Sequence, residues 1–456
     1  MYIEQNALIG IWGYGIVGQS AVNFFIKQGY RVGVMDKRYL TEAEQSFLYT
    51  MNIKVWSEQQ KEEFFNIHDY IFSSPGVNIG MHYATYIHRW ITELDIFRLF
   101  WKKPIIAITG SIGKTSTMHL ADSLLKHAGL RIAVGGNIGK PTFDLLDEQD
   151  TSDYALLETS SFQLQYCISF VPEIAIWTNV YPNHLDHHSS EQDYFLAKYA
   201  IMKHQQSHHV SIVPLVLREK INTFNPNKRT IIYISETKPH ASSMESLRPD
   251  ESIYYYEDAC ITKVSDTAVI QKIHLTEPLA SFSFITNIIT IAALSDLLSI
   301  DSRIVNRLPS ITQLPPHRLE KVATYRGVEF YNDSKSTTIA STNAALNRLH
   351  NRSIHLFIGG LSKGVDRTEF IAHLPKNIQH VYCFGQEAPI LHKICMNNNI
   401  TATSHRTLDE AFDVCITRIQ ENNVVLLSPS GSSYDLYSNY EERGNHFKSL
   451  VHTLFI

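Results

Sequence analysis

The sequence predicts an α/β fold divided into three domains, and three observations lead to this prediction. The chain has 456 residues, and a typical domain has about 150. Short apolar runs of strand length alternate with stretches of helix length along most of the chain, which is typical of parallel sheets with crossover helices. Turns rich in glycine, serine or lysine follow several of these strands, where open α/β sheets bind their ligands.

Composition and charge exclude several classes of protein. Hydrophobic residues make up 44% of the chain and charged residues 19%, so it carries no signature of disorder. The net charge of −5 argues against nucleic acid as a partner, because such binding depends on neutralising phosphates. No apolar run approaches the roughly 18 residues of a membrane span, and no basic residue precedes Lys27, unlike in a signal peptide. The five cysteines contain no C-x-x-C pair. We therefore expect a cytoplasmic monomer in a reducing compartment, without a membrane partner.

The first domain, predicted for residues 1–92, opens with a βαβ unit. A strand at 8–12 leads through a glycine turn into a helix that stops near Gly29, and a second strand at 31–35 ends at Asp36. A later strand at 70–72 ends in a turn. Strand ends of this kind are where a parallel sheet meets its ligand.

The glycine turn itself, Gly13-Tyr14-Gly15-Ile16-Val17-Gly18, fits G-x-G-x-x-G. Asp36 follows Gly13 by 23 residues, near the spacing of a ribose-binding acid. The pattern alone leaves three alternatives open: a dinucleotide, another nucleoside diphosphate, or a turn that only packs a helix on a strand.

The central domain, predicted for residues 93–298, starts with a strand at 105–109 that runs into Gly110-Ser111-Ile112-Gly113-Lys114-Thr115-Ser116. Backbone N–H groups in such a turn can bind phosphates, while Lys114 neutralises charge and the Thr115 hydroxyl can contact Mg²⁺. Gly110 is three residues before Gly113, a shorter spacing than in the common P-loop. A chance Gly-Lys-Thr loop is the alternative.

Further strands of this domain are expected at 131–134, 154–157 and 174–178. Glu158 follows one of them and could bind a divalent cation, or could be a capping or ion-paired residue. The histidines at 184, 187 and 188 invite a zinc site, but they lack further ligands at matching spacing, and a solvated loop is the alternative. Short β-like pieces at 210–216, 230–234 and 252–256 predict an edge sheet, and a helix at 286–298 closes the domain, before a polar segment that ends at Pro309.

The last domain, predicted for residues 299–456, alternates strands at 328–331, 354–358, 381–384 and 424–427 with helices at 338–349, 408–419 and 440–454. Three of these strands end in loops that suit anions, although a solvated lysine is the alternative for each lysine taken alone. The loops are Asn332-Asp333-Ser334-Lys335-Ser336-Thr337, Gly359-Gly360-Leu361-Ser362-Lys363-Gly364-Val365-Asp366 and Ser428-Pro429-Ser430-Gly431-Ser432-Ser433.

Taken in order, these motifs resemble the Mur ligases of peptidoglycan synthesis over nearly the whole chain. The phosphate loop is followed by Asn137-Ile138-Gly139, Glu158 to Gln163, Asn183-His184-Leu185-Asp186, Lys198, His317-Arg318-Leu319-Glu320, Asn332 to Lys335 and Gly359-Gly360. The N-terminal glycine turn, Lys363-Gly364-x-Asp366, Ser433-Tyr434-Asp435 and Tyr440-Glu441-Glu442-Arg443-Gly444 look most like the D-glutamate-adding group of the family. The resemblance implies a Rossmann-like N-terminal domain, a central P-loop-type ATP-binding α/β domain and a C-terminal Rossmann-like α/β domain.

The resemblance also implies an activity, an ATP-dependent amide ligation that joins D-glutamate to UDP-N-acetylmuramoyl-L-alanine through an acyl phosphate, with Mg²⁺ as cofactor. Three substrates must be gathered away from water, so we expect a hinge near residues 296–301 on which the last domain closes.

Site residues are implied position by position. Lys114, His184 and Lys198 would take part in catalysis, and Lys198 matches the family lysine that is carbamylated. The nucleotide would contact Gly110, Ser111, Ile112, Gly113, Lys114, Thr115, Ser116, Asn287, Arg318 and Asp333. Metal ligands would be Thr115, Glu158, His184 and Lys198, the last for a second Mg²⁺. The UDP-sugar would contact Gly15, Ile16, Asp36, Ser73, Gly76, Asn137, Ser160 and Gln163. D-Glutamate would contact Lys335, Thr337, Lys363, Ser433, Tyr434 and Tyr440.

The chain departs from the family pattern at several positions. Ser111-Ile112 replaces Thr-Asn in the phosphate loop, Thr286 and Thr290 flank Asn287 where His and Asn are expected, Leu361 replaces an acid, and Gly431 replaces a frequent Cys. These departures keep three alternatives open: another Mur ligase, a folylpolyglutamate synthase-like amide ligase, or a degenerate nucleotide-binding protein. A nicotinamide-dependent dehydrogenase would leave the Gly-Lys-Thr loop and the segment 184–198 unexplained.

Overall fold

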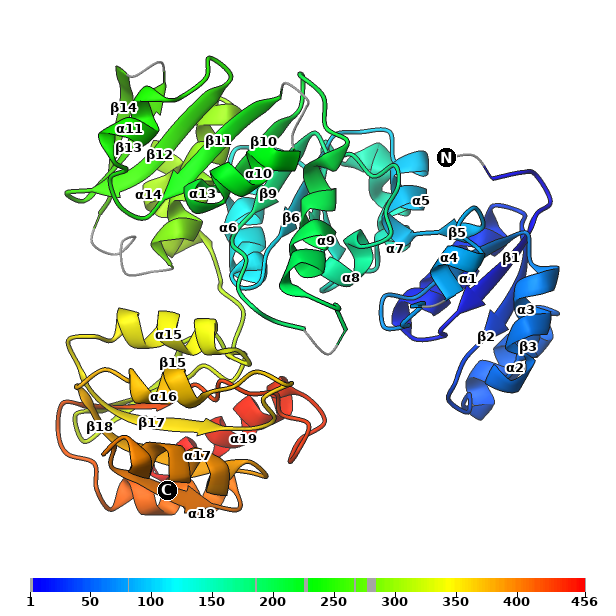
Figure 1. Ribbon diagram of the computed structural model, residues 1–456. Coiled ribbons are helices and arrows are strands. Elements are labelled where there is room, and N and C mark those ends of the chain that lie inside the picture. Colours follow the sequence, from blue (N-terminus) through cyan, green and yellow to red (C-terminus); the bar gives the residue numbers. More distant parts are fainter. Residues whose placement is uncertain are drawn as a thin grey trace. The chain divides into compact units, whose positions relative to one another are not determined.

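The computed structural model describes residues 3–80, 82–184, 187–224, 229–265, 268–276 and 284–455, and its strands form three sheets (Figure 1). Two compact units hold these sheets. Met1–Val180 with Gln192–Gln313 contains the first and second sheets, and Tyr181–Glu191 with Leu314–Ile456 contains the third. Helices connect the strands of every sheet, so the predicted α/β fold class is confirmed. The predicted domain boundaries and the hinge at 296–301 stay predictions.

The first sheet has the strand order β3-β2-β1-β4-β5, and all neighbouring strands are parallel. This is the Rossmann-like order predicted for the N-terminal domain. Apolar residues at helical spacing, such as Ala21, Val22 and Phe25, bury one face of α1 against the sheet. The elements are β1 (Leu8–Trp12), α1 (Ile16–Lys27), β2 (Arg31–Met35), α2 (Glu42–Thr50), β3 (Lys54–Trp56), a 3₁₀ helix at Glu58–Gln60, α3 (Lys61–Ile67), β4 (Tyr70–Ser73), α4 (His82–Thr85) and β5 (Trp90–Ile91).

The second sheet has the strand order β14-β13-β12-β11-β10-β9-β6-β8-β7. The strands from β12 to β7 are parallel, and β13 and β14 add an antiparallel edge. Because β9, β6 and β8 are neighbours, the loops at their carboxyl ends meet at one edge of the sheet. The strands are β6 (Ile105–Thr109), β7 (Ile132–Gly136), β8 (Tyr154–Glu158), β9 (Ile174–Trp177), β10 (Val210–Pro214), β11 (Thr230–Ser235), β12 (Glu251–Glu257), β13 (Cys260–Ser265) and β14 (Ala268–His274).

The helices of this part are α5 (Glu93–Phe100), α6 (Lys114–His127), α7 (Thr142–Leu145), α8 (Ser161–Leu164), α9 (Glu191–Lys203), α10 (Arg218–Phe224), α11 (Ala241–Glu245), α13 (Ile285–Leu297) and α14 (Arg303–Ile311), with 3₁₀ helices at Leu146–Thr151 and Leu215–Leu217. The predicted edge pieces do not form a separate sheet, since β10, β11 and β12 continue the central sheet from β9. The sequence did not predict α14, which contacts α6 and α13, because Pro309 lies inside it.

The third sheet has the strand order β15-β16-β20-β17-β18-β19, with an antiparallel β15–β16 hairpin and parallel pairs elsewhere. The loops after β16, β20 and β17 are therefore neighbours at one edge. The elements are β15 (Glu320–Tyr325), β16 (Val328–Asn332), α15 (Ile339–Arg348), β17 (Ser353–Gly359), α16 (Thr368–Ala372), β18 (Ile378–Phe384), α17 (Ala388–Asn397), β19 (Ala402–His405), α18 (Leu408–Ile416), β20 (Asn423–Leu427) and α19 (Tyr440–Thr453).

Three histidines surround Tyr382 in this sheet. His355 Nδ1 lies 3.0 Å from the Tyr382 hydroxyl, and the rings of His380 and His405 lie 4.5 and 6.5 Å from the tyrosine ring, centroid to centroid. Burial and the neighbouring Arg418 lower the pKa of His380 to about 4. Burial also lowers the pKa of His355 and His405.

This cluster predicts acid sensitivity of the third sheet. His380 is neutral when folded, and in the unfolded chain its pKa is near 6.5. Its contribution to stability is therefore complete above pH 6.5 and is lost as the pH falls toward 4. The loss amounts to about 3 kcal/mol for this residue. In urea unfolding at several pH values, His380→Gln should show a flatter decline below pH 6.5 than the natural protein. His350→Gln, at an exposed position, should not, and equal slopes for all three proteins would contradict this account.

Candidate active site

The phosphate-type loop joins β6 to α6 as the sequence predicts. β6 is completely buried, and the chain leaves it at Gly110 and enters α6 at Lys114. Gly113 precedes the helix with a φ of +82°. A Cβ atom on Gly110 would lie 1.9 Å from Thr178 Oγ1, so only glycine fits there. The loop therefore lies at the N-terminus of α6, where backbone N–H groups and the helix dipole favour an anion.

Asn179, which follows β9, holds this loop. Its Oδ1 accepts hydrogen bonds from the N–H groups of Ser111 and Ile112 at 3.1 and 2.9 Å, and its Nδ2 donates to the Ile112 carbonyl at 3.0 Å. Thr178 Oγ1 donates to the same carbonyl at 2.7 Å. The sequence analysis assigned no role to Asn179, although its place directly after a buried strand was a usable signal.

Replacing Asn179 by alanine is expected to raise the KM for ATP on the order of 10-fold, because three hydrogen bonds that shape the phosphate loop are lost. Asn222→Ala, at an exposed position of α10, is the control and should leave the KM for ATP unchanged. Steady-state kinetics with varied ATP tests the prediction, and equal values for the two variants would contradict it.

A buried carboxylate lies beside the loop. Glu158, the last residue of β8, accepts hydrogen bonds from Thr115 Oγ1 at 2.7 Å and from Asn137 Nδ2 at 3.0 Å. Both donors are neutral, so these contacts do not offset its negative charge. A buried carboxylate oxygen next to a hydroxyl matches the ligands that Mg²⁺ prefers, and the residues present fit this cation. The structure thus brings together two predicted metal ligands, Thr115 and Glu158, and adds Asn137, which the sequence assigned to the UDP-sugar.

Two lysines meet at the start of the same loop. Lys198 on α9 is 1% exposed, and its Nζ donates to the Gly110 carbonyl at 2.8 Å. Lys114 Nζ donates to the same carbonyl at 2.8 Å. Burial, together with the charge of Lys114, lowers the pKa of Lys198 well below its usual value. The predicted catalytic lysines are therefore adjacent, and the buried one is biased toward its neutral amine.

Tyr194 and Asn287 complete the surroundings of this loop. The Tyr194 hydroxyl lies 3.0 Å from Ser111 Oγ, and its ring lies 4.6 Å from Lys198 Nζ. Burial raises the pKa of Tyr194 to about 12. Asn287 on α13 accepts from Thr117 Oγ1 at 3.2 Å, and a Cβ atom on Gly113 would lie 3.1 Å from its Oδ1. Asn287 thus lies next to the loop, in keeping with the predicted nucleotide contact, while the sequence analysis missed Tyr194.

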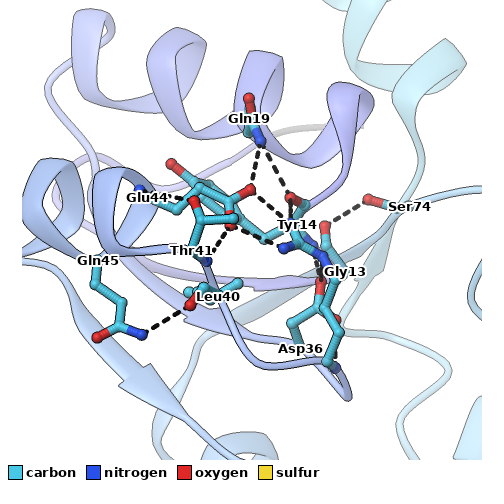
Figure 2. Close-up of polar contacts among 10 residues, drawn as sticks. Gly13, Tyr14, Gln19, Asp36, Leu40, Thr41, Glu44, Gln45 and Ser74 are labelled. Carbon is cyan, nitrogen blue, oxygen red and sulfur yellow. Dashed lines mark hydrogen bonds and ion pairs between the residues drawn. The ribbon is translucent and has the colours of Figure 1, made fainter.

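The N-terminal glycine turn forms a second candidate site (Figure 2). Asp36 Oδ2 accepts from the Tyr14 N–H at 2.6 Å, as expected for an acid placed at the end of β2. Arg38 Nη2 donates to the Tyr14 carbonyl at 2.8 Å and to Glu44 Oε1 at 2.6 Å. The hydrogen bond from Arg38 lowers the pKa of Glu44 to about 2. Ile16 begins α1 and is 76% exposed, so it is accessible to a ligand. The sequence analysis assigned no role to Arg38, although it lies two residues after the acid.

The turn after β4 lies against this glycine turn. Ser74 Oγ donates to the Gly13 carbonyl at 2.7 Å (Figure 2). Ser73 and Gly76 belong to the same turn. A Cβ atom on Gly18 would lie 1.9 Å from the Gly13 oxygen, so the third glycine is needed for close packing. The residues that the sequence assigned to one ligand site in the first sheet are therefore neighbours.

Ser160 and Gln163 bond to one another at the start of α8. Ser160 Oγ donates to Gln163 Oε1 at 3.0 Å, and Gln163 Nε2 donates to Glu93 Oε2 at 2.8 Å. The other oxygen of Glu93 accepts from Thr142 Oγ1 at 2.8 Å. Both predicted UDP-sugar contacts are thus held by a buried carboxylate that the sequence analysis missed.

The second unit collects the predicted amino-acid contacts at the edge of the third sheet. Lys335 Nζ lies 3.6 Å from the centre of the Tyr440 ring. Asp333 accepts from Ser336 Oγ at 2.5 Å and Ser428 Oγ at 2.7 Å, and burial raises its pKa to about 6. The remaining predicted residues lie on the neighbouring loops after β16, β17 and β20: Thr337, Lys363, Ser433 and Tyr434.

Some predictions stay untested by this geometry. His184 and Arg318 lie in the second unit, so their predicted roles beside first-unit residues stay predictions. Leu185 and Asp186 lie outside the described residues. Within the described ranges, no group of three or more His, Cys, Asp or Glu side chains is arranged to hold a metal ion, which gives the zinc alternative no support there. In the same part of the chain, no helix is both long and apolar enough to span a bilayer.

A glycine-rich loop between a buried parallel strand and a helix, with a carboxylate at the end of the adjacent strand, defines a nucleotide-phosphate-binding α/β protein. Comparisons with known proteins specify the class further. Residues 108–294 match the Mur ligase middle domain, residues 317–431 match the glutamate ligase domain of Mur ligases, and residues 7–87 match the MurD-like N-terminal domain of Mur ligases.

Full-length relatives agree. A UDP-N-acetylmuramoylalanine–D-glutamate ligase of Fervidobacterium nodosum is 30% identical over 458 residues, which cover 99% of each chain. Another of the same name, from Natranaerobius thermophilus, is 31% identical over 97% of each chain. A pseudomurein peptide ligase type C from Methanothermus fervidus shares the fold, with a TM-score of 0.60 and 16% identity over 98% of this chain and 100% of that one. The chain belongs to the Mur ligase family, and the resemblance seen in its motifs is confirmed.

Proposed function

We propose that this chain is an ATP-dependent ligase that joins D-glutamate to the alanyl carboxyl group of UDP-N-acetylmuramoyl-L-alanine in the synthesis of peptidoglycan precursors. The observation that carries the proposal is the cluster of Lys114, Lys198, Thr115 and Glu158 around the phosphate loop. The names of the full-length relatives and the glutamate ligase domain matched at 317–431 support the choice of substrates.

The reaction has two steps whose bonds balance. The alanyl carboxylate attacks the γ-phosphorus of ATP, which forms an acyl phosphate and releases ADP. The amine of D-glutamate then attacks the acyl carbon, a C–N bond forms, the amine loses a proton and phosphate leaves. Phosphorylation is needed because a carboxylate is a poor electrophile. Charge spreads over the phosphoryl oxygens in the first step, and fixed positive groups are the main means of stabilising it.

The residues of the central domain fit these demands. N–H groups at the start of α6 hold phosphate oxygens, and Lys114 neutralises the transferring group. Thr115 and Glu158 would hold Mg²⁺, which supplies further charge stabilisation when bound. The neutral amine of Lys198 can add to CO₂ and lose a proton, which converts a buried cation into a carbamate suited to a second Mg²⁺. His184 is proposed as a further ligand.

The two other substrates have separate sites in this proposal. The glycine turn at 13–18 with Asp36 would bind the UDP-sugar, whose diphosphate suits the N-terminus of α1. D-Glutamate carries two carboxylates, and Lys335 and Lys363 provide positive charge at the edge of the third sheet. A cytoplasmic location and a monomeric state belong to the same proposal.

The test is a phosphate-release assay with each substrate omitted in turn. Release should require ATP, UDP-N-acetylmuramoyl-L-alanine and D-glutamate together. Release with L-lysine or diaminopimelate in place of D-glutamate would assign the chain to another Mur ligase activity. Saturation of the intrinsic fluorescence by NAD but not by UDP would favour a dehydrogenase, and binding of nucleotide without turnover would favour a binding protein.

A further inference from the structure

Arg367 and Glu387 form a buried ion pair next to the loop that carries Lys363. Arg367 is 3% exposed and precedes α16, and Glu387 precedes α17. Arg367 Nη2 donates to Glu387 Oε2, and the other carboxylate oxygen of Glu387 accepts from the N–H of Ser362 at 3.0 Å. The pair therefore contacts the backbone of the loop itself.

The same guanidinium also holds the start of this loop. Arg367 Nη1 donates to the Gly359 carbonyl at 3.2 Å, and Nη2 donates to the Gly360 carbonyl at 3.0 Å. A planar guanidinium can reach two carbonyls and a carboxylate at once, whereas a lysine ammonium is a single point of attachment. Arg367 and Glu387 together thus fix the loop at Gly359, Gly360 and Ser362.

The loop needs such support because its backbone is strained. Lys363 has a φ of +54°, and its neighbour Gly364 has a φ of +79°. A residue with a side chain adopts this left-handed conformation only where its surroundings impose it, and such strain gathers at ligand sites. The conformation that presents Lys363 therefore depends on the contacts that hold the loop.

The ion pair also explains a departure from the family pattern, Gly431. Leu361 and Ser432 exchange two backbone hydrogen bonds of 2.9 Å, which bring the loops after β17 and β20 into contact. A Cβ atom on Gly431 would lie 2.4 Å from the Gly359 oxygen and 2.9 Å from Arg367 Nη1. The close approach that Arg367 stabilises thus leaves room only for glycine at 431.

We propose that Arg367 and Glu387 are positioning residues for the amino-acid substrate, acting through the loop that presents Lys363, and that Gly431 is matched to them. Neither member of the pair is proposed to touch the substrate. The inference rests on the proposed function, in which Lys363 binds D-glutamate. It adds a pair of residues whose effect should be confined to the amino acid.

The experiment compares steady-state kinetics for all three substrates. Arg367→Met should raise the KM for D-glutamate about 10-fold or more while the KM for ATP and for the UDP-sugar stay within about twofold, because only the amino-acid loop loses its geometry. Arg367→Lys should restore this KM only in part, because it keeps the charge and loses the fork. The control is Arg352→Met, which removes a more exposed ion pair with Glu329 in the same unit and should leave all KM values unchanged.

A second set of variants keeps the test decisive if Arg367→Met does not fold, since a lone buried charge destabilises a fold. Arg367→Met with Glu387→Gln removes both charges and keeps an acceptor for the Ser362 N–H, and it should still show the raised KM for D-glutamate. Gly431→Ala should raise the same KM, and its effect combined with Arg367→Met should be less than additive. An unchanged KM for D-glutamate in the folded variants, or an equal rise for all three substrates, would overturn the inference. If the natural protein uses another amino acid, the proposed function fails and the same comparison is made with that amino acid.

Discussion

Replacement of Lys198 by alanine is expected to lower the rate of phosphate release by on the order of 10²- to 10³-fold. Lys198 is buried beside Gly110, Lys114 and the carboxylate of Glu158, so it cannot serve as a solvated surface charge. Its lowered pKa favours the neutral amine that can form a carbamate. Removing it deletes the group that would hold a second Mg²⁺ close to the transferring phosphoryl group.

The measurement is turnover with all three substrates at saturation, with and without added formate or acetate. A small carboxylic acid can occupy the space of the missing side chain, so partial recovery of the rate is expected. Lys203→Ala, at an exposed position of the same helix, is the control and should keep full activity. Full activity of Lys198→Ala would contradict the role assigned to this residue, and a loss without any recovery would argue against the carbamate.

Replacement of Lys114 by methionine should lower kcat by a similar factor, on the order of 10²- to 10³-fold, because Lys114 supplies the fixed positive charge of the phosphate loop. Methionine keeps most of the length of the side chain and removes only the ammonium group and its hydrogen bonds to the carbonyls of Gly110 and Ser111. Single-turnover formation of ADP separates the chemical step from product release and is the measurement that checks this expectation.

The matched control is Lys126→Met. Lys126 lies on the same helix, where it forms an exposed ion pair with Asp122 at 2.9 Å, and exposed pairs of this kind contribute little. A fall in kcat for Lys114→Met that is no greater than the fall for Lys126→Met would show that Lys114 does not stabilise the transferring group.

Much of the fold followed from local patterns in the sequence. Strands such as β1, β6 and β17 are buried apolar runs that end at glycine, and this contrast is visible without a structure. β14 was missed because it is an edge strand whose residues are mostly exposed, so its sequence lacks a clear alternation. α14 was missed because proline usually ends a helix, whereas here Pro309 lies in its last turn.

The candidate site was predictable where a residue lies at the end of a strand or in the loop that follows it. Asp36, Glu158 and Lys335 were found in this way, because parallel strands place their carboxyl ends at one edge of a sheet. Asn179 and Glu93 were not found, since their importance lies in hydrogen bonds to residues 49 to 70 positions away in the chain. Contacts over such separations depend on tertiary packing and leave no periodic signal.

The central claim, that this Mur ligase family member adds D-glutamate to a UDP-sugar carrying L-alanine, is tested most directly by identifying the product. The purified protein is incubated with ATP, Mg²⁺, UDP-N-acetylmuramoyl-L-alanine and an equimolar mixture of D-glutamate, L-glutamate, L-lysine and diaminopimelate, and the nucleotide products are analysed by mass spectrometry and chiral chromatography. The account predicts a single product that contains one D-glutamate residue in amide linkage. A product that contains one of the other amino acids, or ADP formation without any new amide, would contradict it.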